Sequence, residues 1–245
     1  MESDNSIKFD QFSEIIIVSN RGPVTFSKNV EGEVTFKRGS GGLVTALTGL
    51  AHHTKLTWVA CAMSEEDAEW KQGEICSEND DCNLSVYFIN PAPEAYEGYY
   101  NQISNPLLWF LQHSMWDVPR SPVIDHQTWI AWDTGYQVVN RQFAREISEL
   151  VKKMDKPVLI MLQDYHLYLT ARYLKKFLRG QDVTISLFVH IPLTNCCRAP
   201  ARSDNIKTPS FWFTIGPSFA TKFIPSAIEL TNNTSYIFIA ATARG

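Results

Sequence analysis

The segment "KPVLIMLQDYHLYLTARYLKKFL", residues 156–178, joins a continuous apolar run to an amphipathic one. The run at 157–162 predicts a strand buried on both faces, which is typical of a parallel sheet. A loop at 163–166 and a helix at 167–178 follow in our prediction. The stretch "VTISLFVHIP" at 183–192 repeats the strand-then-loop pattern. Strands that alternate with helices indicate βαβ units and a doubly wound α/β domain with a mainly parallel sheet.

The same rules extend the prediction toward the N-terminus. Apolar runs predict buried strands in "EIIIVSN" (14–20), "KLTWVAC" (55–61) and "NLSVYFIN" (83–90). The segments "GPVTFSK" (22–28) and "GEVTFKR" (32–38) predict a hairpin across "NVEG".

Three helices are predicted in the regions between these strands. The first is short and covers 43–50, and the second covers the aromatic-rich region 94–116, where Pro106 marks a break or a helix start. The third covers 125–154. Its apolar residues recur at helical intervals, at Trp129, Trp132, Tyr136, Val139, Phe143, Ile147 and Val151.

Composition places the chain among globular proteins. It has 245 residues, 44% of them hydrophobic and 20% charged, with a net charge of −4. This balance gives no basic footprint for nucleic acid or an anionic membrane. No apolar run of about 18 residues is present and the N-terminal stretch "MESDNSIKFDQFSE" is polar and acidic, so neither a transmembrane helix nor a secretory signal is predicted. Five cysteines without CxxC spacing predict reduced thiols in a cytoplasmic protein and no zinc site.

Polar clusters follow three of the predicted strands, at 19–21, at 164–166 and at His190. In open α/β sheets, ligands bind beyond the carboxyl ends of the strands. Each cluster also has a structural interpretation: Arg21 pairing with a surface carboxylate, Asp164 capping the next helix, and His190 as a satisfied core histidine. Their shared position at one rim of the sheet favours a binding site.

The stretch "GSGGLVTAL" (39–47) leads from small residues directly into an apolar helical segment. One interpretation is an ordinary loop in which Ser40 caps the helix. The other is a phosphate cradle, in which the bare N–H groups around Gly41 and Gly42 face an anion. Spacing alone leaves both interpretations open.

The side chains at this rim suit a phosphorylated sugar. Arg21 offers a forked donor for phosphate, and Asp164 and His190 can hydrogen-bond hydroxyl groups. Tyr100 and Trp109 can pack against the apolar face of a sugar, although core packing is the commoner role of such rings. The GxxxxGK[ST], GxSxG and HExxH motifs are absent, which weakens kinase-like, hydrolase and metalloprotease interpretations.

Together, several motifs resemble those of one enzyme family, the trehalose-6-phosphate synthases. The likeness covers 14–192 and corresponds to the N-terminal half of these retaining glycosyltransferases, whose two facing Rossmann-like domains form a GT-B fold with helices on both faces of each sheet. In chain order, the motifs are "VSNRGPV", "GSGGLVTAL", "YYNQISNPLLWF", "GYQVVN.QFA", "QDYHLYL" and "FVHIP".

The resemblance implies that glucose moves from a nucleotide sugar such as UDP-glucose to glucose 6-phosphate, giving trehalose 6-phosphate. It implies no metal, no cofactor and no covalent enzyme intermediate, since the nucleotide sugar is a co-substrate. A homo-oligomer is compatible with it. By motif, the expected catalytic residues that contact the transferred glucose are Asp164 and His190. The expected substrate-binding residues are Arg21, Tyr100 and Trp109 for the sugar phosphate, and Gly41 and Gly42 near the donor's diphosphate.

Two departures from the family pattern affect these expectations. Cys61 stands where many members carry a second tryptophan, which brings the chain closer to a branch with validoxylamine-phosphate-synthase-like pseudo-glycosyltransferases that use a cyclitol phosphate. After Pro192, the segment 193–245 is rich in Ser, Thr and Asn and does not resemble the family's continuation, although 235–241 can form a strand. We therefore expect a polar segment at 1–13, an acceptor-side domain at 14–192 and a truncated or frame-shifted tail without a donor domain. A non-catalytic sugar-phosphate-binding module, and a product without a stable fold, are the alternatives.

Overall fold

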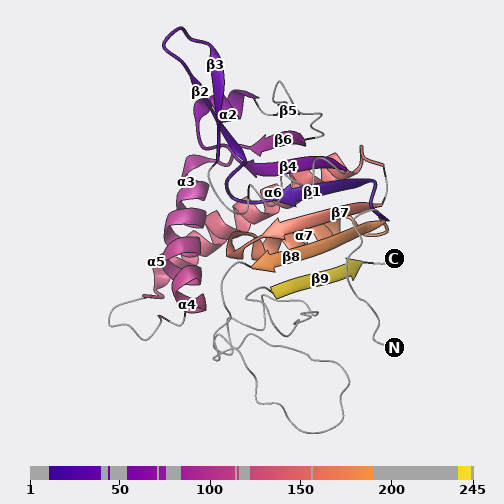
Figure 1. Cartoon of the computed structure of the whole chain (residues 1–245). Helices are drawn as coiled ribbons and strands as arrows, with labels where there is room; N and C mark the ends of the chain where they lie inside the picture. Colours follow the sequence, from indigo (N-terminus) through magenta and orange to yellow (C-terminus); the bar gives the residue numbers. More distant parts are fainter. Residues whose placement is uncertain are drawn as a thin grey trace, which may run out of the picture.

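The computed structural model describes residues 11–39, 44, 54–70, 72–75, 84–113, 115, 122–155, 157–189 and 237–243. A seven-stranded sheet of order β5-β6-β4-β1-β7-β8-β9 lies at its centre (Figure 1). The strands are β1 (Glu14–Val18), β4 (Lys55–Cys61), β5 (Gln72–Glu74), β6 (Leu84–Ile89), β7 (Val158–Gln163), β8 (Val183–Val189) and β9 (Ile237–Ala243).

The central strand β1 pairs in parallel with β4 on one side and with β7 on the other, so that Val18 lies opposite both Val59 and Leu162. The pairs β4–β6 and β7–β8 are also parallel, whereas the edge strands β5 and β9 are antiparallel. The chain builds outward from β1 through β4 and β6, and then returns to the other side of β1 for β7 and β8. The predicted doubly wound and mainly parallel sheet is therefore confirmed, with its switch in strand order between β1 and β7.

The predicted hairpin is also confirmed, as a separate two-stranded sheet of β2 (Val24–Lys28) and β3 (Val34–Arg38). In its turn, Gly32 adopts a φ of 83°, a conformation that favours glycine. A short helix that the sequence did not predict, α2 (Glu65–Trp70), lies beside the base of the hairpin. The buried carboxylate of Asp67 in α2 accepts hydrogen bonds from the backbone N–H of Phe26 at 2.7 Å and of Met63 at 2.9 Å.

Helical chain covers most of the described residues in both of the longer regions in which helices were predicted. The first region contains α3 (Pro93–Tyr96), the π-helix η3 (Glu97–Trp109) and α4 (Phe110–Gln112). The second contains α5 (His126–Ala131), the π-helix η4 (Trp132–Tyr136) and α6 (Gln137–Val151). After β7 come the 3₁₀ turn η5 (Tyr165–Leu167) and α7 (Tyr168–Phe177).

Two expectations for these helices need correction. Pro106 lies inside η3 and neither breaks it nor starts a helix. Pro106 has no backbone N–H, so η3 continues through it without the one hydrogen bond that this residue would otherwise donate. Trp129 was assigned to the apolar face of the third predicted helix, but its side chain is 41% exposed.

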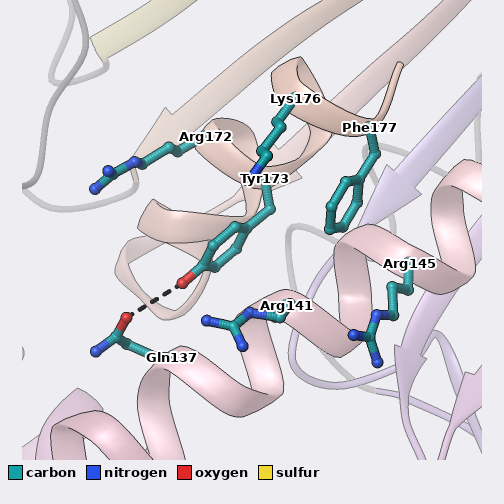
Figure 2. A pocket seen from close by; sticks show the side chains of 7 residues that line it. All are labelled: Gln137, Arg141, Arg145, Arg172, Tyr173, Lys176 and Phe177. Atoms are coloured by element: carbon teal, nitrogen blue, oxygen red, sulfur yellow. Dashed lines mark hydrogen bonds between the residues drawn. The ribbon is translucent and has the colours of Figure 1, made fainter. Parts of the chain in front are cut away.

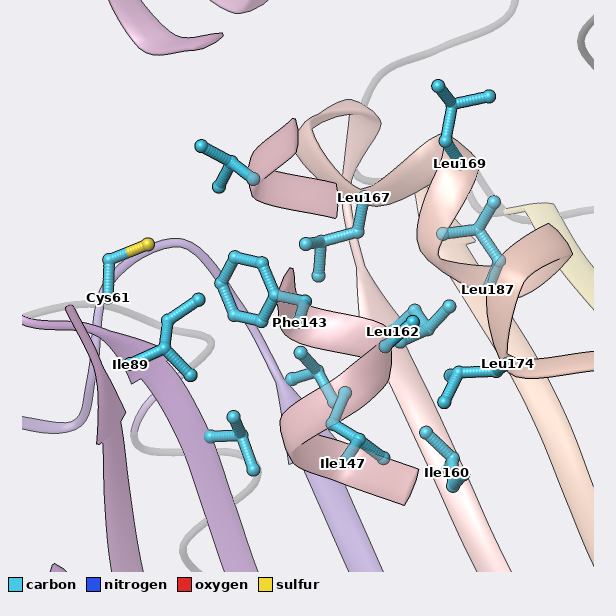
Figure 3. Close-up of a cluster of buried hydrophobic side chains, with 14 of the residues drawn as sticks. Cys61, Ile89, Phe143, Ile147, Ile160, Leu162, Leu167, Leu169, Leu174 and Leu187 are labelled. Atoms are coloured by element: carbon cyan, nitrogen blue, oxygen red, sulfur yellow. The ribbon is translucent and has the colours of Figure 1, made fainter. Parts of the chain in front are cut away.

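Alternate residues of β1 enter two hydrophobic clusters, because successive side chains of a strand point to opposite faces. Ile16 and Val18 join the larger cluster, which includes residues of α6 and α7, whereas Ile15 and Ile17 join a smaller one. Figure 3 shows the centre of the larger cluster, where Phe143 of α6 lies beside Leu162 of β7. Side chains of the hairpin contribute to the smaller cluster.

Some predictions fall on other parts of the chain. The predicted helix at 43–50 lies outside the described residues, except for Val44. The strand suggested at 235–241 is present as β9, Ile237–Ala243, beside β8. None of the described helices is both long enough and apolar enough to cross a membrane.

Candidate functional site

Two of the polar clusters predicted at strand ends lie at the switch in strand order. Arg21 follows the last residue of β1 by three positions, and Asp164 directly follows β7. Because Val18 and Leu162 are paired in the sheet, both clusters leave the same edge of adjacent strands. The structure therefore brings Arg21 and Asp164 to one rim, as the sequence predicted.

The backbone of Arg21 is fixed by a buried hydrogen-bonded pair. The Ser19 hydroxyl donates to the Arg21 carbonyl at 2.6 Å, and the Trp58 indole N–H donates to the Ser19 Oγ at 2.7 Å. Ser19 and Trp58 are both buried, whereas the Arg21 residue is exposed. A rigid strand end thus carries a guanidinium that extends from the rim.

Arg21 lines a cavity of about 530 Å³ that also contains Lys37 and Arg38, the last two residues of β3. The remaining lining residues are Gly22, Thr25, Gly39, Val44, Trp58 and Met63. No carboxylate belongs to this described lining, so three cations surround the space. The sequence analysis missed Lys37 and Arg38, although the "KRG" that leads into the glycine-rich stretch was a usable signal.

A row of aromatic rings links the end of β1 to the end of β7. The Asn20 side-chain amide donates to the Tyr96 hydroxyl at 3.2 Å, and the Tyr96 ring stacks on Tyr100 with centroids 5.5 Å apart. Tyr100 in turn stacks on His166 at 5.7 Å, and His166 on Tyr165 at 4.2 Å. Burial raises the pKa of Tyr96 to about 12, so its hydroxyl stays protonated at neutral pH.

Asp164 occupies an uncommon backbone conformation at this rim. Its φ of 72° and ψ of 174° lie in a region that is almost restricted to glycine, so that an aspartate there is strained by about 1–3 kcal/mol. Its N–H donates to the Phe188 carbonyl at 2.6 Å, and its carboxylate accepts from the Tyr165 N–H at 2.9 Å. The capping interpretation of Asp164 therefore describes a real contact. Such strain often occurs at functional sites.

His166 is the rim residue whose chemistry the sequence left undeveloped. Its Nε2 atom is buried and has no hydrogen-bond partner among the described residues. Burial lowers the pKa of its imidazole to about 4, and the positive charge of Arg21 acts in the same direction. The ring is therefore neutral at neutral pH.

We expect this neutral ring to make stability depend on pH. The His166 pKa is about 4 in the folded chain against an ordinary value of 6.5, so between these values the unfolded chain binds more protons. The free energy of unfolding should fall as pH is lowered from 6.5 toward 4. Above pH 6.5 the His166 ring is neutral in both the folded and the unfolded chain, so its effect on the free energy of unfolding should no longer change with pH. Urea titrations of the wild type and of His166→Phe measure this part of the pH dependence. A ring that titrates near its ordinary pKa by NMR would contradict it.

The structure does not bring every predicted site residue to the rim. Trp109 lies at the end of η3, and its ring contacts Phe110 at 5.1 Å and His113 at 4.1 Å rather than the ring row. Gly41, Gly42 and His190 lie outside the described residues. Within the described ranges, no group of three or more His, Cys, Asp or Glu side chains is placed to hold a metal ion.

Comparison with known proteins agrees with this architecture. Residues 13–196 match the model of Glycosyltransferase family 20. The chain belongs to this family. It is 32% identical over 180 residues to the α,α-trehalose-phosphate synthase [UDP-forming] of Schizosaccharomyces pombe, an alignment that covers 73% of this chain and 33% of the relative. It is 33% identical over 180 residues to a trehalose-6-phosphate synthase of Mycobacterium sp. (strain KMS), covering 74% of this chain and 33% of the relative.

Two solved structures match about the same share of this chain as these sequence relatives do. The apo structure of OtsA superposes with a TM-score of 0.53 at 26% identity, covering 75% of this chain and 35% of OtsA. The E. coli protein bound with UDP-2-fluoro glucose superposes with a TM-score of 0.50 at 26% identity, covering 74% of this chain and 33% of the E. coli chain. The chain thus spans about a third of the length of the relatives it matches, and it corresponds to the N-terminal part of a GT-B glycosyltransferase.

Proposed function

We propose that this chain is the acceptor-side domain of a trehalose-6-phosphate synthase, with the domain at 14–192. In the reaction, the bond from the anomeric carbon of glucose to the nucleotide diphosphate breaks, and a bond to a hydroxyl oxygen of glucose 6-phosphate forms with retained configuration. The names of the relatives support UDP as the leaving nucleotide. The nucleotide sugar is a co-substrate, and the reaction needs no further cofactor.

The observation that carries this proposal is the cationic cavity that Arg21, just after β1, forms with the hairpin and with Trp58 of β4. Arg21, Lys37 and Arg38 supply charge for the acceptor's phosphate. Tyr100, half-buried in the ring row, offers a face for the sugar. Asp164, strained at the end of β7, is placed to accept hydrogen bonds from sugar hydroxyls. These are the residue types that recognition of a sugar phosphate requires.

Other parts of the proposal rest on the family motifs. Gly41 and Gly42 approach the donor's diphosphate, and His190 contacts the transferred glucose together with Asp164. Trp109 belongs to the same acceptor motif as Tyr100. Cys61 is fully buried and is not among the residues that line the Arg21 cavity, so its replacement of a tryptophan does not by itself decide between glucose 6-phosphate and a cyclitol phosphate as the acceptor. The odd number of cysteines without CxxC spacing supports a cytoplasmic location.

Replacing Arg21 with alanine should weaken binding of glucose 6-phosphate by roughly 10- to 150-fold. This range corresponds to about 1.5–3 kcal/mol for a charged hydrogen-bond partner. Unphosphorylated glucose should be affected far less, because it lacks the group that Arg21 binds. Arg21→Lys should recover part of the loss, since a point charge does not reproduce the fork. Calorimetric titration of both sugars measures these differences.

Lys55→Ala is the matched control, because Lys55 begins β4 and so lies at the opposite end of the parallel strands. It should leave affinity for the sugar phosphate within about twofold, as expected for a surface charge. Equal losses for glucose and its phosphate in Arg21→Ala, or none for either, would reject the phosphate role. Titration with UDP-glucose and an assay for trehalose 6-phosphate complete the test. If the chain binds glucose 6-phosphate but neither binds UDP-glucose nor forms trehalose 6-phosphate, the result would favour a non-catalytic sugar-phosphate-binding module over an enzyme.

A further inference from the structure

Basic side chains line two of the cavities among the described residues. Figure 2 shows one of them, of about 620 Å³, where Arg141 and Arg145 extend from α6. The Arg141 guanidinium already has an aromatic partner there, since it lies 5.2 Å from the centre of the Tyr173 ring. The other is the Arg21 cavity, of about 530 Å³, at the base of the hairpin. The two cavities share no lining residue, so a substitution in one can serve as a control for the other.

The cations of the Arg21 cavity form no salt bridge among the described residues. On the same hairpin, the Lys28 ammonium lies 3.2 Å from the Glu69 carboxylate. By contrast, none of the salt bridges in the described part of the chain involves Arg21, Lys37 or Arg38. Like charges that line one space repel one another, and a bound anion relieves that repulsion. The stabilisation that results increases with the negative charge of the anion.

The backbone that carries the hairpin cations is held beside Arg21. Lys37 lies opposite Thr25 in the register of the hairpin, and both residues line the cavity. At the end of β3, the Gly39 N–H donates to the Pro23 carbonyl at 2.7 Å, which ties this strand end to the segment that follows Arg21. Because the backbone is already in place, less conformational entropy is lost when all the cations contact one ligand.

The Arg21 cavity adjoins the row of aromatic rings. Met63 lines the cavity, and the Tyr96 hydroxyl donates to the Met63 Sδ at 3.6 Å. Tyr96 in turn stacks on Tyr100, with ring centroids 5.5 Å apart. A ligand whose anionic group lies among the cations can therefore extend a sugar toward these rings. Different residues then recognise the charge and the sugar.

We propose that Lys37 and Arg38 make the Arg21 cavity selective for a doubly charged phosphate monoester over a singly charged ester of the same shape. The proposal rests on the proposed function, which assigns the acceptor's phosphate to this cavity. A phosphate monoester carries about −1.5 to −2 charges at neutral pH. Arg21 alone can bind either ester through its paired N–H donors. The second negative charge gains most where further cations lie near it, and Lys37 and Arg38 supply them.

The test is calorimetric titration of the full chain with glucose 6-phosphate and with glucose 6-sulfate. The two esters share the hexose and a tetrahedral anion, but the sulfate carries a single negative charge. The wild type should bind the phosphate about tenfold or more tightly than the sulfate. In Lys37→Gln/Arg38→Gln, this preference should fall to about threefold or less, because the cations near the second charge are gone. Each single variant should give an intermediate preference.

A pH series provides a readout that a purely structural role of the hairpin would not move. The second pKa of a phosphate monoester is about 6, so the wild type should lose roughly fivefold in affinity for glucose 6-phosphate from about pH 7.5 to about pH 5. The loss should be less than about threefold in Lys37→Gln/Arg38→Gln, and the affinity for glucose 6-sulfate should change little in either protein. Burial holds the pKa of the nearby His166 at about 4, so its ring stays mostly neutral over this range. Apart from the three cations, the described lining of the cavity holds no ionisable side chain.

Lys28→Gln/Arg145→Gln is the matched control, because it removes the same number of exposed cations outside the cavity, one on the hairpin and one on α6. It should retain the wild-type preference within about twofold. The proposal is overturned if the wild type does not prefer the phosphate, or if Lys37→Gln/Arg38→Gln keeps the full preference or loses no more of it than the control does. Binding of glucose 6-phosphate that depends on Arg21 but not on the hairpin cations would overturn this proposal and leave the proposed function standing. Absence of binding of either ester to the wild type would overturn both.

Discussion

Replacing Asn140 with leucine is expected to lower the free energy of unfolding by about 2–6 kcal/mol, because it leaves at least two buried backbone groups without partners at about 1–3 kcal/mol each. The Asn140 amide donates to the Tyr136 carbonyl at 2.9 Å and to the His166 carbonyl at 3.0 Å. Its oxygen accepts from the N–H and hydroxyl of Thr170 at 3.0 and 2.8 Å. Leucine is of similar size but replaces none of these hydrogen bonds. Urea unfolding at fixed pH measures the loss.

The same substitution at an exposed position provides the control. Asn101 is exposed on η3 and its amide donates only to the nearby Glu97 side chain in the described contacts. Asn101→Leu should therefore change stability by no more than about 0.5 kcal/mol. Because Asn140 also fixes the backbone of His166, Asn140→Leu should alter the NMR signals of the His166 ring. Equal stabilities of the two variants would show that the buried network contributes little.

The strands of the central sheet were predictable because their burial on both faces leaves a direct mark in the sequence. "EIIIVSN" and "KLTWVAC" gave β1 and β4 to within two residues, since a strand covered on both faces must be apolar throughout. Short polar elements leave no such mark. In α2, "EEDAEW", the buried residue is Asp67, a charged side chain held by backbone N–H groups that fold around it. Its burial depends on the hairpin, so local pattern did not reveal it.

The residues of the candidate site also fall into two groups, those that the sequence pattern predicts and those that only the packing of elements brings together. Arg21 and Asp164 were predicted together, because the carboxyl ends of adjacent parallel strands meet at one edge. Lys37 and Arg38 were not, because their approach to Arg21 depends on where the hairpin lies against the sheet. Similarly, the stacking of Tyr100 on His166 depends on how η3 packs beside η5. Sequence pattern indicates which strand ends carry polar groups, whereas packing between elements sets what joins them.

The packing of η3 depends on a close approach between two glycines. A Cβ atom added at Gly135 in η4 would lie 2.7 Å from the Gly98 Cα and carbonyl carbon, and 2.7 Å from the Tyr99 nitrogen. All three atoms belong to the backbone of η3, which cannot move aside as a flexible side chain can. Gly135→Ala is therefore expected to lower the free energy of unfolding by at least about 3 kcal/mol, the upper end of the usual cost of overpacking.

Two comparisons isolate this steric cost from helix propensity. Alanine gains about 1 kcal/mol over glycine inside a helix, so propensity alone predicts that Gly135→Ala is stabilising. At Gly98, an added Cβ would lie 3.2 Å from its nearest atom, so Gly98→Ala should cost less than Gly135→Ala. Urea unfolding of both variants measures which of them has the lower free energy of unfolding. Gly135→Ala at or above wild-type stability would contradict the close approach. The displaced η3 should carry Tyr100 away from His166, so glucose 6-phosphate affinity should fall more in Gly135→Ala than in Gly98→Ala.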